Sequence, residues 1–496
     1  MTPSIAQDTA LLRYGVAPRS SRSHRITIVS NRLSSTVRVE GGAVRLSPSS
    51  GGLASGLRRV HARSSATWIG WPGIAAETAR AAQREIDARL LEAGARGIPL
   101  SDGEVGGFYR RVANGVLWPV LHDTVPDTPA APADWNIYRA VNARFADVIL
   151  REARPGDRIW VHDYHLMLLP RMLRERRSDL RVAFFLHTPF PGEAPLAALP
   201  QAGALIDGIL GADVVAFHTQ EYVERFSSAV RALLGRRVEL TSGSGVADDA
   251  GRPVCVHACP MSVDVAGFAA RAADRRVAPR VAALRAAGRP LFVGVDRLDP
   301  TKGIPRRLEA FGRLLDARPD LRGRARLLQL SVPSREDMPA YRALRTRVDA
   351  IAADLNARLG TRSWQPVEHR YGSVDEIELA ALYRAADVML VTPFCDGMNL
   401  VAKEFVASRT DHDGVLVLSE RAGAAAELSA ALLVDPRDLD GLACAYGSAL
   451  DMSPAERRVR MRRLAARVHG HDVRRWAEEC LHQLDAAVRM ARDSAS

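Results

Sequence analysis

The chain has 496 residues, 47% of them hydrophobic, and a formal net charge of +11 at pH 7. This length predicts two or three domains with cores of their own, and no apolar run reaches the roughly 18–20 residues that a membrane-spanning helix needs. The arginines are spread along many amphipathic segments instead of lining one face between aromatic residues. Neither a nucleic acid nor a membrane is therefore expected as a partner.

Residues 1–24 contain several arginines and serines but no hydrophobic signal-peptide core, so they are predicted to be a disordered tail on a cytoplasmic protein. The five cysteines are odd in number and scattered, which argues against a disulfide framework and favours a reducing compartment. Cys255, His257 and Cys259 alternate along one predicted strand. We interpret them as packing residues, because no second pair of metal ligands stands nearby.

In the first half of the chain, short apolar runs end in polar residues and are followed by helical segments. This repeated β–α pattern predicts an α/β fold with a parallel, right-handed, doubly wound sheet. The strands of this sheet are expected at residues 25–30, 158–161, 181–186 and 214–219.

Polar residues follow three of these strands. Arg32 comes after the first strand, Asp163 after the second and His187 after the third. Ligands bind at the carboxyl ends of the strands in such sheets, so these side chains are candidates for one site. His162, Asp163 and His165 also suggest a metal, but neighbouring residues at a strand end point in different directions. Asp163 is therefore interpreted as a hydroxyl acceptor or base.

A second α/β run follows a predicted hinge at residues 260–264. Arg297 and Lys302 stand on one strand-to-helix connection, where two cations beside a helix N-terminus suit a diphosphate. Arg335 places a further cation at the end of the next strand. The strands of this second run are expected at residues 290–295, 326–332, 388–392, 415–418 and 432–434.

Two short motifs are interpreted as helix caps. The segment 373–376, Ser-Val-Asp-Glu, has the spacing of a capping box that begins a helix. Asp438-Leu439-Asp440 has the form of an Asp-x-Asp metal motif, but it follows Asp435-Pro436 at a predicted helix start. We therefore expect Asp438 to cap a helix and not to bind a metal.

The segment 388–404 combines a short buried strand, a tight turn and a helix that is expected to begin near Asn399. Such a turn directs backbone N–H groups, at the positive end of a helix dipole, into one small volume. Asp396 and Gly397 lie in the turn, and Glu404 follows two helical turns later, where a second carboxylate could reach a sugar hydroxyl. The segment is predicted to bind an anion or a polyhydroxylated ligand.

Taken together, the motifs of residues 25–490 resemble the trehalose-6-phosphate synthases, a family of retaining GT-B glycosyltransferases. No single motif is specific, but the combination is. The matching segments are VSNRL (29–33), SGGL (50–53), LWP (117–119), WVHDYHL (160–166), FFLHTPFP (184–191), RLD (297–299), KG (302–303) and DGMNLVAKE (396–404).

The resemblance implies a GT-B architecture, with two Rossmann-like doubly wound domains facing a central cleft. An acceptor-binding domain would span residues 25–265 and a nucleotide-sugar-binding domain residues 266–469, with a C-terminal helix at about 470–490 packing back on the first domain. The implied reaction makes α,α-trehalose 6-phosphate from UDP-, GDP- or ADP-glucose and glucose 6-phosphate. It proceeds with retention and without a cofactor or a metal, in a protein expected to be a homo-oligomer.

The same resemblance assigns roles to individual residues. Asp163, His187, Arg297, Lys302 and Asp396 would carry the catalysis. Glucose 6-phosphate would be bound by Arg32, Trp71, Tyr109, Trp118, Asp163 and Arg335. The nucleotide-glucose donor would be bound by Gly52, His187, Arg297, Lys302, Asp396, Gly397, Met398, Asn399, Leu400, Val401 and, at the ribose, Glu404.

Four positions depart from the usual family pattern. Cys395 stands where the family commonly has arginine, Pro300 where an aromatic residue is usual, Thr188 where an aliphatic residue is usual and Ser262 where glycine is usual. Cys395 removes a cation from the donor turn, and it would expose a thiol to oxidation or alkylation.

Two other interpretations remain open from the sequence. A related transferase with a different phosphorylated acceptor would keep the donor site but alter the acceptor residues, and Arg32, Tyr109 and Arg335 are all retained. A non-catalytic sugar-phosphate sensor would be expected to lose Arg297, Lys302 or Asp396. Each of these three is also present.

Overall fold

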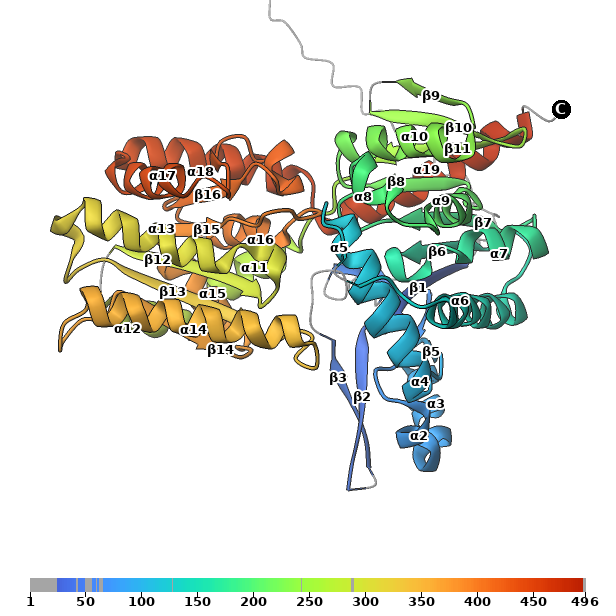
Figure 1. Ribbon diagram of the computed structural model, residues 1–496, viewed down its shortest axis with the longest axis horizontal. Coiled ribbons are helices and arrows are strands. Elements are labelled where there is room, and N and C mark those ends of the chain that lie inside the picture. The colour runs from blue at the N-terminus through green and yellow to red at the C-terminus, as the bar shows by residue number, and fades with distance from the viewer. Residues whose placement is uncertain are drawn as a thin grey trace, which may run out of the picture.

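The computed structural model describes residues 25–493 except 42, 50–55, 59, 62–65, 127, 242 and 287–289. In it, two α/β units lie side by side (Figure 1). The tail expected at residues 1–24 and the predicted donor residue Gly52 lie outside the described residues. No helix in the described ranges is long and apolar enough to cross a membrane.

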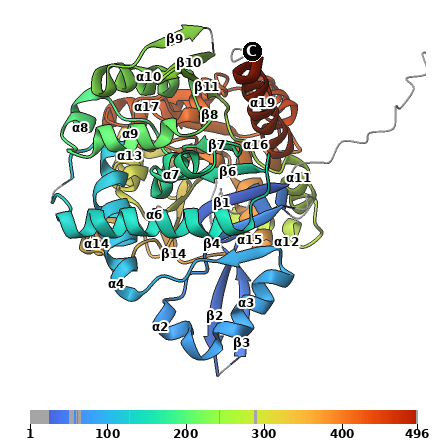
Figure 2. The same ribbon diagram turned by 90° about the vertical axis from the view of Figure 1, so that its right-hand side faces the viewer.

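The first unit is built on a nine-stranded sheet in the order β5-β4-β1-β6-β7-β8-β11-β10-β9. Its strands are parallel except for the antiparallel pairings of β9, β10 and β11. A separate antiparallel hairpin, β2–β3, projects from the unit (Figures 1 and 2). The strands are β1 (Ile26–Arg32), β2 (Ser35–Glu40), β3 (Ala43–Pro48), β4 (Thr67–Trp71), β5 (Ala95–Gly97), β6 (Arg158–His162), β7 (Arg181–Phe185), β8 (Val214–Phe217), β9 (Val238–Thr241), β10 (Ser244–Asp249) and β11 (Arg252–Ala258).

Alternate residues of these strands enter two cores, one on each face of the sheet. Val161 and Phe184 pack with α6, α7, α9 and α10, whereas Trp160 and Phe185 pack with α3 and the C-terminal helix α19. The helices of this unit are α2 (Ala76–Ala79), η1 (Arg80–Ala82), α3 (Gln83–Glu92), α4 (Asp102–Glu104), η2 (Val105–Leu117), α5 (Trp118–Leu121), α6 (Pro132–Glu152), η3 (Tyr164–Leu166), α7 (Leu169–Arg176), α8 (Glu193–Ala197), α9 (Ala202–Leu210), α10 (Gln220–Leu234) and α19 (Val473–Asp493).

The second unit is built on a six-stranded parallel sheet in the order β14-β13-β12-β15-β16-β17. Its central strands are largely buried on both faces, and β15 (388–391) is apolar throughout, as its sequence predicts. The strands are β12 (Leu291–Arg297), β13 (Arg326–Val332), β14 (Val367–Tyr371), β15 (Val388–Val391), β16 (Val415–Ser419) and β17 (Leu432–Val434).

Helices cover both faces of this sheet as well. One face packs on α11, α12, α15, α16 and α18, and the other on α13, α14 and α17. The helices are α11 (Val265–Ala272), α12 (Val277–Ala286), η4 (Pro300–Lys302), α13 (Ile304–Ala317), η5 (Pro319–Leu321), α14 (Pro339–Leu359), α15 (Glu376–Ala385), α16 (Leu400–Ser408), η6 (Gly423–Ala426), α17 (Leu439–Asp451) and α18 (Pro454–Gly470).

Among the parallel strands that follow one another along the chain, each sheet has one switch point where strand order reverses, and both mark candidate ligand sites. In the first sheet, the chain builds outward from β1 through β4 to β5 and then returns to β6 on the other side of β1. In the second sheet, it builds from β12 through β13 to β14 and then returns to β15. The strand ends at these two switch points carry Arg32 and Asp163 in the first sheet, and Arg297 and Asp396 in the second.

The chain crosses between the units twice. Residues 259–264 lead from β11 into α11, and residues 471–472 lead from α18 into α19. The first crossing is held from both sides at Met261, whose N–H donates to His218 Nδ1 (3.3 Å) and whose carbonyl accepts from Lys403 Nζ (2.7 Å). Because His218 belongs to the first unit and Lys403 to α16, this residue joins the two.

Candidate active site

Asp396 is the central carboxylate at the switch point of the second sheet. Its Oδ2 accepts hydrogen bonds from Lys302 Nζ (2.5 Å) and from Asn399 Nδ2 (2.9 Å). Burial alone would raise the pKa of Asp396, but Lys302 and Asn399 lower it below its ordinary value overall. The carboxylate therefore stays ionised at neutral pH and is held in one orientation.

Two backbone conformations bring these groups together. Asn399 has a φ of 68° and caps α16 by accepting from the Ala402 N–H, so the helix begins where the sequence predicts. Gly303, with a φ of 66°, follows Lys302. A Cβ at Gly303 would lie 2.5 Å from the Thr392 carbonyl oxygen, so only glycine allows the β12–α13 connection to pack against the end of β15.

Gly397 is the point where the turn of the second unit touches the first unit. A Cβ on Gly397 would lie 2.0 Å from the carbonyl oxygen of His187. Tyr222, on α10 of the first unit, donates from its hydroxyl to the Asp396 carbonyl (3.2 Å). The two walls of the cleft therefore meet at the residues for which a sugar-binding role is predicted.

His187 lies after β7 with polar contacts on two sides. Its Nε2 is 3.0 Å from His162 Nδ1, so one ring donates and the other accepts, and its N–H donates to Asp163 Oδ1 (3.2 Å). Burial lowers the pKa of His187 well below its ordinary value, and the neighbouring His218 lowers it further. The imidazole is therefore neutral at physiological pH and acts as a hydrogen-bonding group.

Asp163 occupies an unusual backbone conformation at the end of β6. Its φ is 75°, and its N–H donates to the Phe185 carbonyl on β7 (2.8 Å). Burial raises the pKa of Asp163 to about 6, although Arg297 and Arg335 act in the opposite direction. A carboxylate held this way beside two cations is suited to accept hydrogen bonds from sugar hydroxyls.

Arg335 reaches from the second unit into the first. It has a φ of 48°, and its Nη2 donates to the Tyr164 hydroxyl (3.2 Å). Its guanidinium lies 4.2 Å from the centre of the Trp118 ring, a cation–π contact. Nη1 lies 3.4 Å from Asp299 Oδ2 and also donates to Tyr341. Arg335 is thus a buried cation placed at the junction of the two units.

Aromatic rings line the first unit beside this junction. The Arg32 guanidinium lies 4.7 Å from the Trp71 ring centre, and the Trp71 ring is 5.9 Å from that of Tyr109. Tyr109 stacks on His165 at 5.8 Å and interacts electrostatically with both Arg32 and Arg335. Cations from the two units therefore flank one aromatic-lined volume, which is an arrangement suited to a sugar phosphate.

The remaining donor residues of the sequence analysis lie along the same turn and helix. Met398 is buried, and Leu400 and Val401 form the first turn of α16. Glu404 accepts a hydrogen bond from the Tyr383 hydroxyl (2.7 Å), and burial raises its pKa. Arg297 ends β12 with an exposed side chain, 5.4 Å from the Trp118 ring centre. Its charge is therefore open to a ligand in the cleft.

The buried Arg307 was missed by the sequence analysis. It pairs with Asp296, which is also buried, and it donates to Gln329 Oε1 (2.8 Å), Thr392 Oγ1 (3.1 Å) and the Lys302 carbonyl (3.3 Å). These bonds tie β12, β13 and β15 together beneath the Lys302–Asp396 pair. The signal in the sequence was weak, because an arginine early in an amphipathic helix usually faces solvent.

Replacing Arg307 with methionine is expected to lower the free energy of unfolding by about 3–5 kcal/mol, since it leaves the Asp296 carboxylate buried without its cation. Arg306→Met is the matched control. The Arg306 side chain is 37% exposed and its pair with Glu309 lies at the surface, so a change of at most about 1 kcal/mol is expected. Equilibrium urea unfolding followed by circular dichroism measures both; equal losses would contradict the role given to Arg307.

The four departures from the family pattern have different surroundings. Pro300 begins η4, where its fixed φ suits the first turn. The hydroxyls of Thr188 and Ser262 are buried and have no hydrogen-bond partner among the described residues. Cys395 is partly buried, and burial together with Asp123 and Asp396 raises its pKa to about 12. A raised pKa lowers the thiolate fraction, so Cys395 is less reactive at neutral pH than a fully exposed thiol would be.

The interpretation of the two cap motifs is half right. Asp438 caps α17 by accepting from the Gly441 N–H (2.9 Å), as expected. The helix predicted to begin at the 373–376 box instead begins at Glu376, and its cap is Asp375, which accepts from the Glu378 N–H. Among the residues that the structure describes, no three His, Cys, Asp or Glu side chains are grouped closely enough to hold a metal.

Residues 24–486 match the model of glycosyltransferase family 20. The chain is 41% identical to a trehalose-6-phosphate synthase of Mycolicibacterium paratuberculosis, covering 92% of this chain and 94% of that protein. It is 40% identical to a bifunctional trehalose-6-phosphate synthase/phosphatase of Thermoproteus tenax, covering 93% of this chain but only 64% of that longer protein.

Two solved structures of similar proteins also superimpose on this chain over most of its length. A synthase of Burkholderia xenovorans in complex with glucose 6-phosphate superimposes with a TM-score of 0.83 at 32% identity, covering 93% of this chain and 100% of that one. An Escherichia coli protein bound with UDP-2-fluoro glucose gives 0.82 at 32% identity, with 93% and 98% covered. The two facing α/β units are the GT-B fold. The chain therefore belongs to glycosyltransferase family 20, the family of the trehalose-6-phosphate synthases.

Proposed function

We propose that the protein transfers glucose from a nucleotide-glucose to glucose 6-phosphate and releases α,α-trehalose 6-phosphate. The observation that carries this proposal is the convergence of cations from both units on the His187–Asp163 corner of the cleft. Arg297 and Lys302 lie on the donor side, and Arg335 and Arg32 on the acceptor side. A reaction that joins one diphosphate-bearing sugar to one phosphate-bearing sugar needs two such anion sites. The ligands of the Burkholderia and Escherichia coli structures are of these two kinds.

The acceptor is proposed to bind between Arg32, Tyr109 and Arg335. Its phosphate would take charge-assisted hydrogen bonds from the two guanidinium groups, and Trp71 and Trp118 would pack against the sugar. Asp163 would accept hydrogen bonds from the acceptor hydroxyls. Because Arg335 comes from the second unit, acceptor binding would favour the closed arrangement of the cleft.

The donor is proposed to bind along the turn after β15. One Lys302 N–H is directed at Asp396, so the other two remain for the diphosphate, together with Arg297. Asp396 and the backbone amides of the following residues would bind the glucose hydroxyls, and the neutral His187 would face the same sugar. Predicted donor ligands also include Gly52 at the diphosphate, Glu404 at the ribose, and Gly397, Met398, Asn399, Leu400 and Val401 along the turn.

Transfer with retention is proposed to occur on one face of the sugar. The bond from the anomeric carbon to the diphosphate oxygen breaks, and the acceptor hydroxyl oxygen forms its bond to the same face. The acceptor proton passes to the departing diphosphate. Arg297 and Lys302 stabilise the negative charge that builds up on the leaving group, a task that a metal ion performs in other transferases. Closure of the cleft limits hydrolysis of the donor by water.

The acid limb of the pH profile of kcat/KM for glucose 6-phosphate is expected to depend on the ionisation of Asp163. The carboxylate form is needed to accept a hydrogen bond, and its pKa is raised to about 6, so kcat/KM for glucose 6-phosphate should fall as the pH drops below that value. The acceptor phosphate itself titrates near pH 6. Log kcat/KM should therefore fall by about two per pH unit in the native protein but by about one in Asp163→Asn. Equal slopes in the native protein and in Asp163→Asn would contradict the assignment of Asp163 to the acceptor site.

An acceptor panel tests the proposed function. Glucose 6-phosphate is expected to support release of the nucleoside diphosphate, whereas glucose and glucose 1-phosphate should support far less. Preference for another sugar phosphate would favour a sister transferase. Tight binding of glucose 6-phosphate without turnover of any donor would favour a sensor.

A further inference from the structure

Two buried thiols lie together where the chain first leaves the first unit. Cys259 Sγ is 2.7 Å from Cys480 Sγ, although the two residues are 221 positions apart in sequence. The side chains are buried, with 6% and 4% of their residue surface exposed. A disulfide bond has a sulfur–sulfur length of about 2.05 Å, so the two sulfurs need to approach by less than about 1 Å to bond.

Hydrogen bonds hold the backbone on both sides of this pair. The Cys259 N–H donates to the Phe217 carbonyl on β8 (2.7 Å), and the Trp476 indole N–H donates to the Cys259 carbonyl (3.2 Å). One turn earlier, the Val473 N–H at the start of α19 donates to the Val263 carbonyl (3.0 Å). The position of Cys480 relative to Cys259 is therefore fixed by the docking of α19 on the sheet, and is not a chance approach of two mobile side chains.

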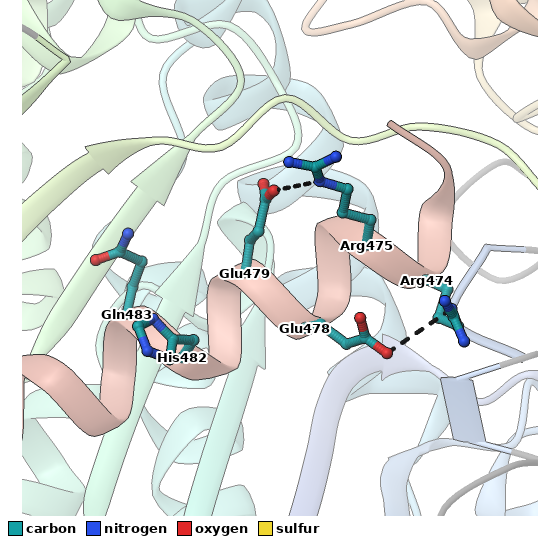
Figure 3. A pocket seen from close by; sticks show the side chains of 6 residues that line it. All are labelled: Arg474, Arg475, Glu478, Glu479, His482 and Gln483. Atoms are coloured by element: carbon teal, nitrogen blue, oxygen red, sulfur yellow. Dashed lines mark hydrogen bonds and ion pairs between the residues drawn. The ribbon is translucent and has the colours of Figure 1, made fainter. Parts of the chain in front are cut away.

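The two faces of α19 differ in a way that places Cys480 inward. Figure 3 shows the outer face, where Arg475 pairs with Glu479 (2.8 Å) and Arg474 with Glu478 (3.7 Å) around a shallow hollow. The inner face carries Trp476, Cys480 and Leu484, which belong to the core shared with β6, β7 and β11. The sulfur of Cys480 is thus directed at the sheet and at Cys259.

A metal does not explain the pair. Cys255 and His257 lie on β11 just before Cys259, but in the described residues no group of three ligating side chains is formed there. Burial raises the pKa of Cys480 well above its ordinary value, and Cys259 raises it further. The Cys480 thiol is therefore protonated at neutral pH.

We propose that Cys259 and Cys480 are a redox-sensitive pair that forms a disulfide bond and locks helix α19 to the end of β11. The oxidant class is a low-molecular-weight disulfide. One cysteine loses its proton and attacks that disulfide, giving a mixed disulfide and one free thiolate. The second cysteine loses its proton and displaces the other half, so two protein thiols become one disulfide and the two protons leave with two small thiols.

The disulfide bond would restrain the contact between α19 and the residues behind the proposed active site. The Trp476 ring lies 6.1 Å from the His187 ring, 5.2 Å from that of Trp160 and 5.3 Å from that of Phe185. Cys480 is one helical turn beyond Trp476, so a bond at that position prevents α19 from leaving this wall. The closed loop spans more than 200 residues, the case in which a cross-link constrains the unfolded chain most.

The test uses the full-length protein, incubated with oxidised glutathione and compared with a sample kept in dithiothreitol. Oxidation is expected to remove the thiols of Cys259 and Cys480 from the five of the denatured protein, in addition to any glutathione adduct at the exposed Cys444. Non-reducing digestion and mass spectrometry should then show one cross-linked peptide pair containing Cys259 and Cys480. Cys255→Ser is the matched control: it removes a buried thiol of the same strand and should leave the cross-link intact, whereas Cys480→Ser should abolish it.

Stability provides a second readout. The oxidised native protein is expected to have a Tm several degrees above that of the reduced protein, and dithiothreitol should reverse the shift. The comparison within the native sequence stands even if Cys480→Ser fails to fold. The proposal would be overturned if glutathione adducts formed on single cysteines without any Cys259–Cys480 cross-link. It would also be overturned if the cross-linked protein had an unchanged Tm.

Discussion

Replacing Lys302 with methionine is expected to lower kcat by about 10³-fold, with a much smaller effect on the KM for glucose 6-phosphate. The side chain is buried beside Asp396, where water screens its charge poorly. In the proposed mechanism, the attraction of Lys302 for the diphosphate grows as negative charge develops on the leaving oxygen, so the loss of Lys302 would fall mainly on the transition state. Steady-state release of nucleoside diphosphate at saturating acceptor measures the effect.

The control for this variant is Arg306→Met, which removes a nearby cation from the first turn of α13, where its side chain is partly exposed. It should keep kcat within about twofold, since a surface charge contributes little to a buried site. Circular dichroism checks that both variants fold. A Lys302→Met protein with near-native kcat and a raised donor KM would show that Lys302 only binds the donor and does not stabilise the leaving group.

Replacing Arg335 with glutamine is expected to raise the KM for glucose 6-phosphate by about 10²-fold while changing the donor KM by less than about threefold. The substitution would remove the buried, charge-assisted contact that is proposed for the acceptor phosphate. Glucose, which lacks that phosphate, provides an internal comparison. Its low kcat/KM should be nearly the same with Arg335→Gln as with the native protein.

Arg335 also pairs with Asp299 and Tyr341, so a structural effect needs its own control. Tyr341→Phe removes the hydrogen bond from the Tyr341 hydroxyl to Asp299 Oδ2 (2.9 Å) and the one that this hydroxyl accepts from Arg335, but it leaves the guanidinium and its pairing with Asp299 in place. It should lower stability without a selective loss of acceptor affinity. If Arg335→Gln raised both KM values equally, the assignment of Arg335 to the acceptor phosphate would be wrong.

Much of the fold follows directly from local patterns. The strands at 326–332 and 432–434 have the bounds that the apolar runs predict, and Asn399 caps α16 because its side chain accepts from the helix and its backbone tolerates a positive φ. The predicted candidate residues after the strands converge because parallel strands share one carboxyl edge. That topological rule alone brings Asp163 and His187 to adjacent strand ends.

Other features depend on contacts between distant segments and have no local signal. Arg307 is buried because Asp296, Gln329 and Thr392 surround it, and no periodicity reveals such a network. The cap at Asp375 competes with a plausible box starting two residues earlier, and only the chain path after β14 decides between them. Cys259 and Cys480 meet because α19 returns to the first sheet, which residue spacing cannot show.

The proposed transfer is tested most directly by incubating the purified protein with UDP-, GDP- or ADP-glucose and glucose 6-phosphate in the presence of EDTA. We expect glucose-6-phosphate-dependent release of nucleoside diphosphate with at least one donor, and NMR of the product should show both anomeric carbons in the α configuration of a 1,1-linkage. No product from any of the three donors, or a product with an inverted anomeric centre, would contradict it.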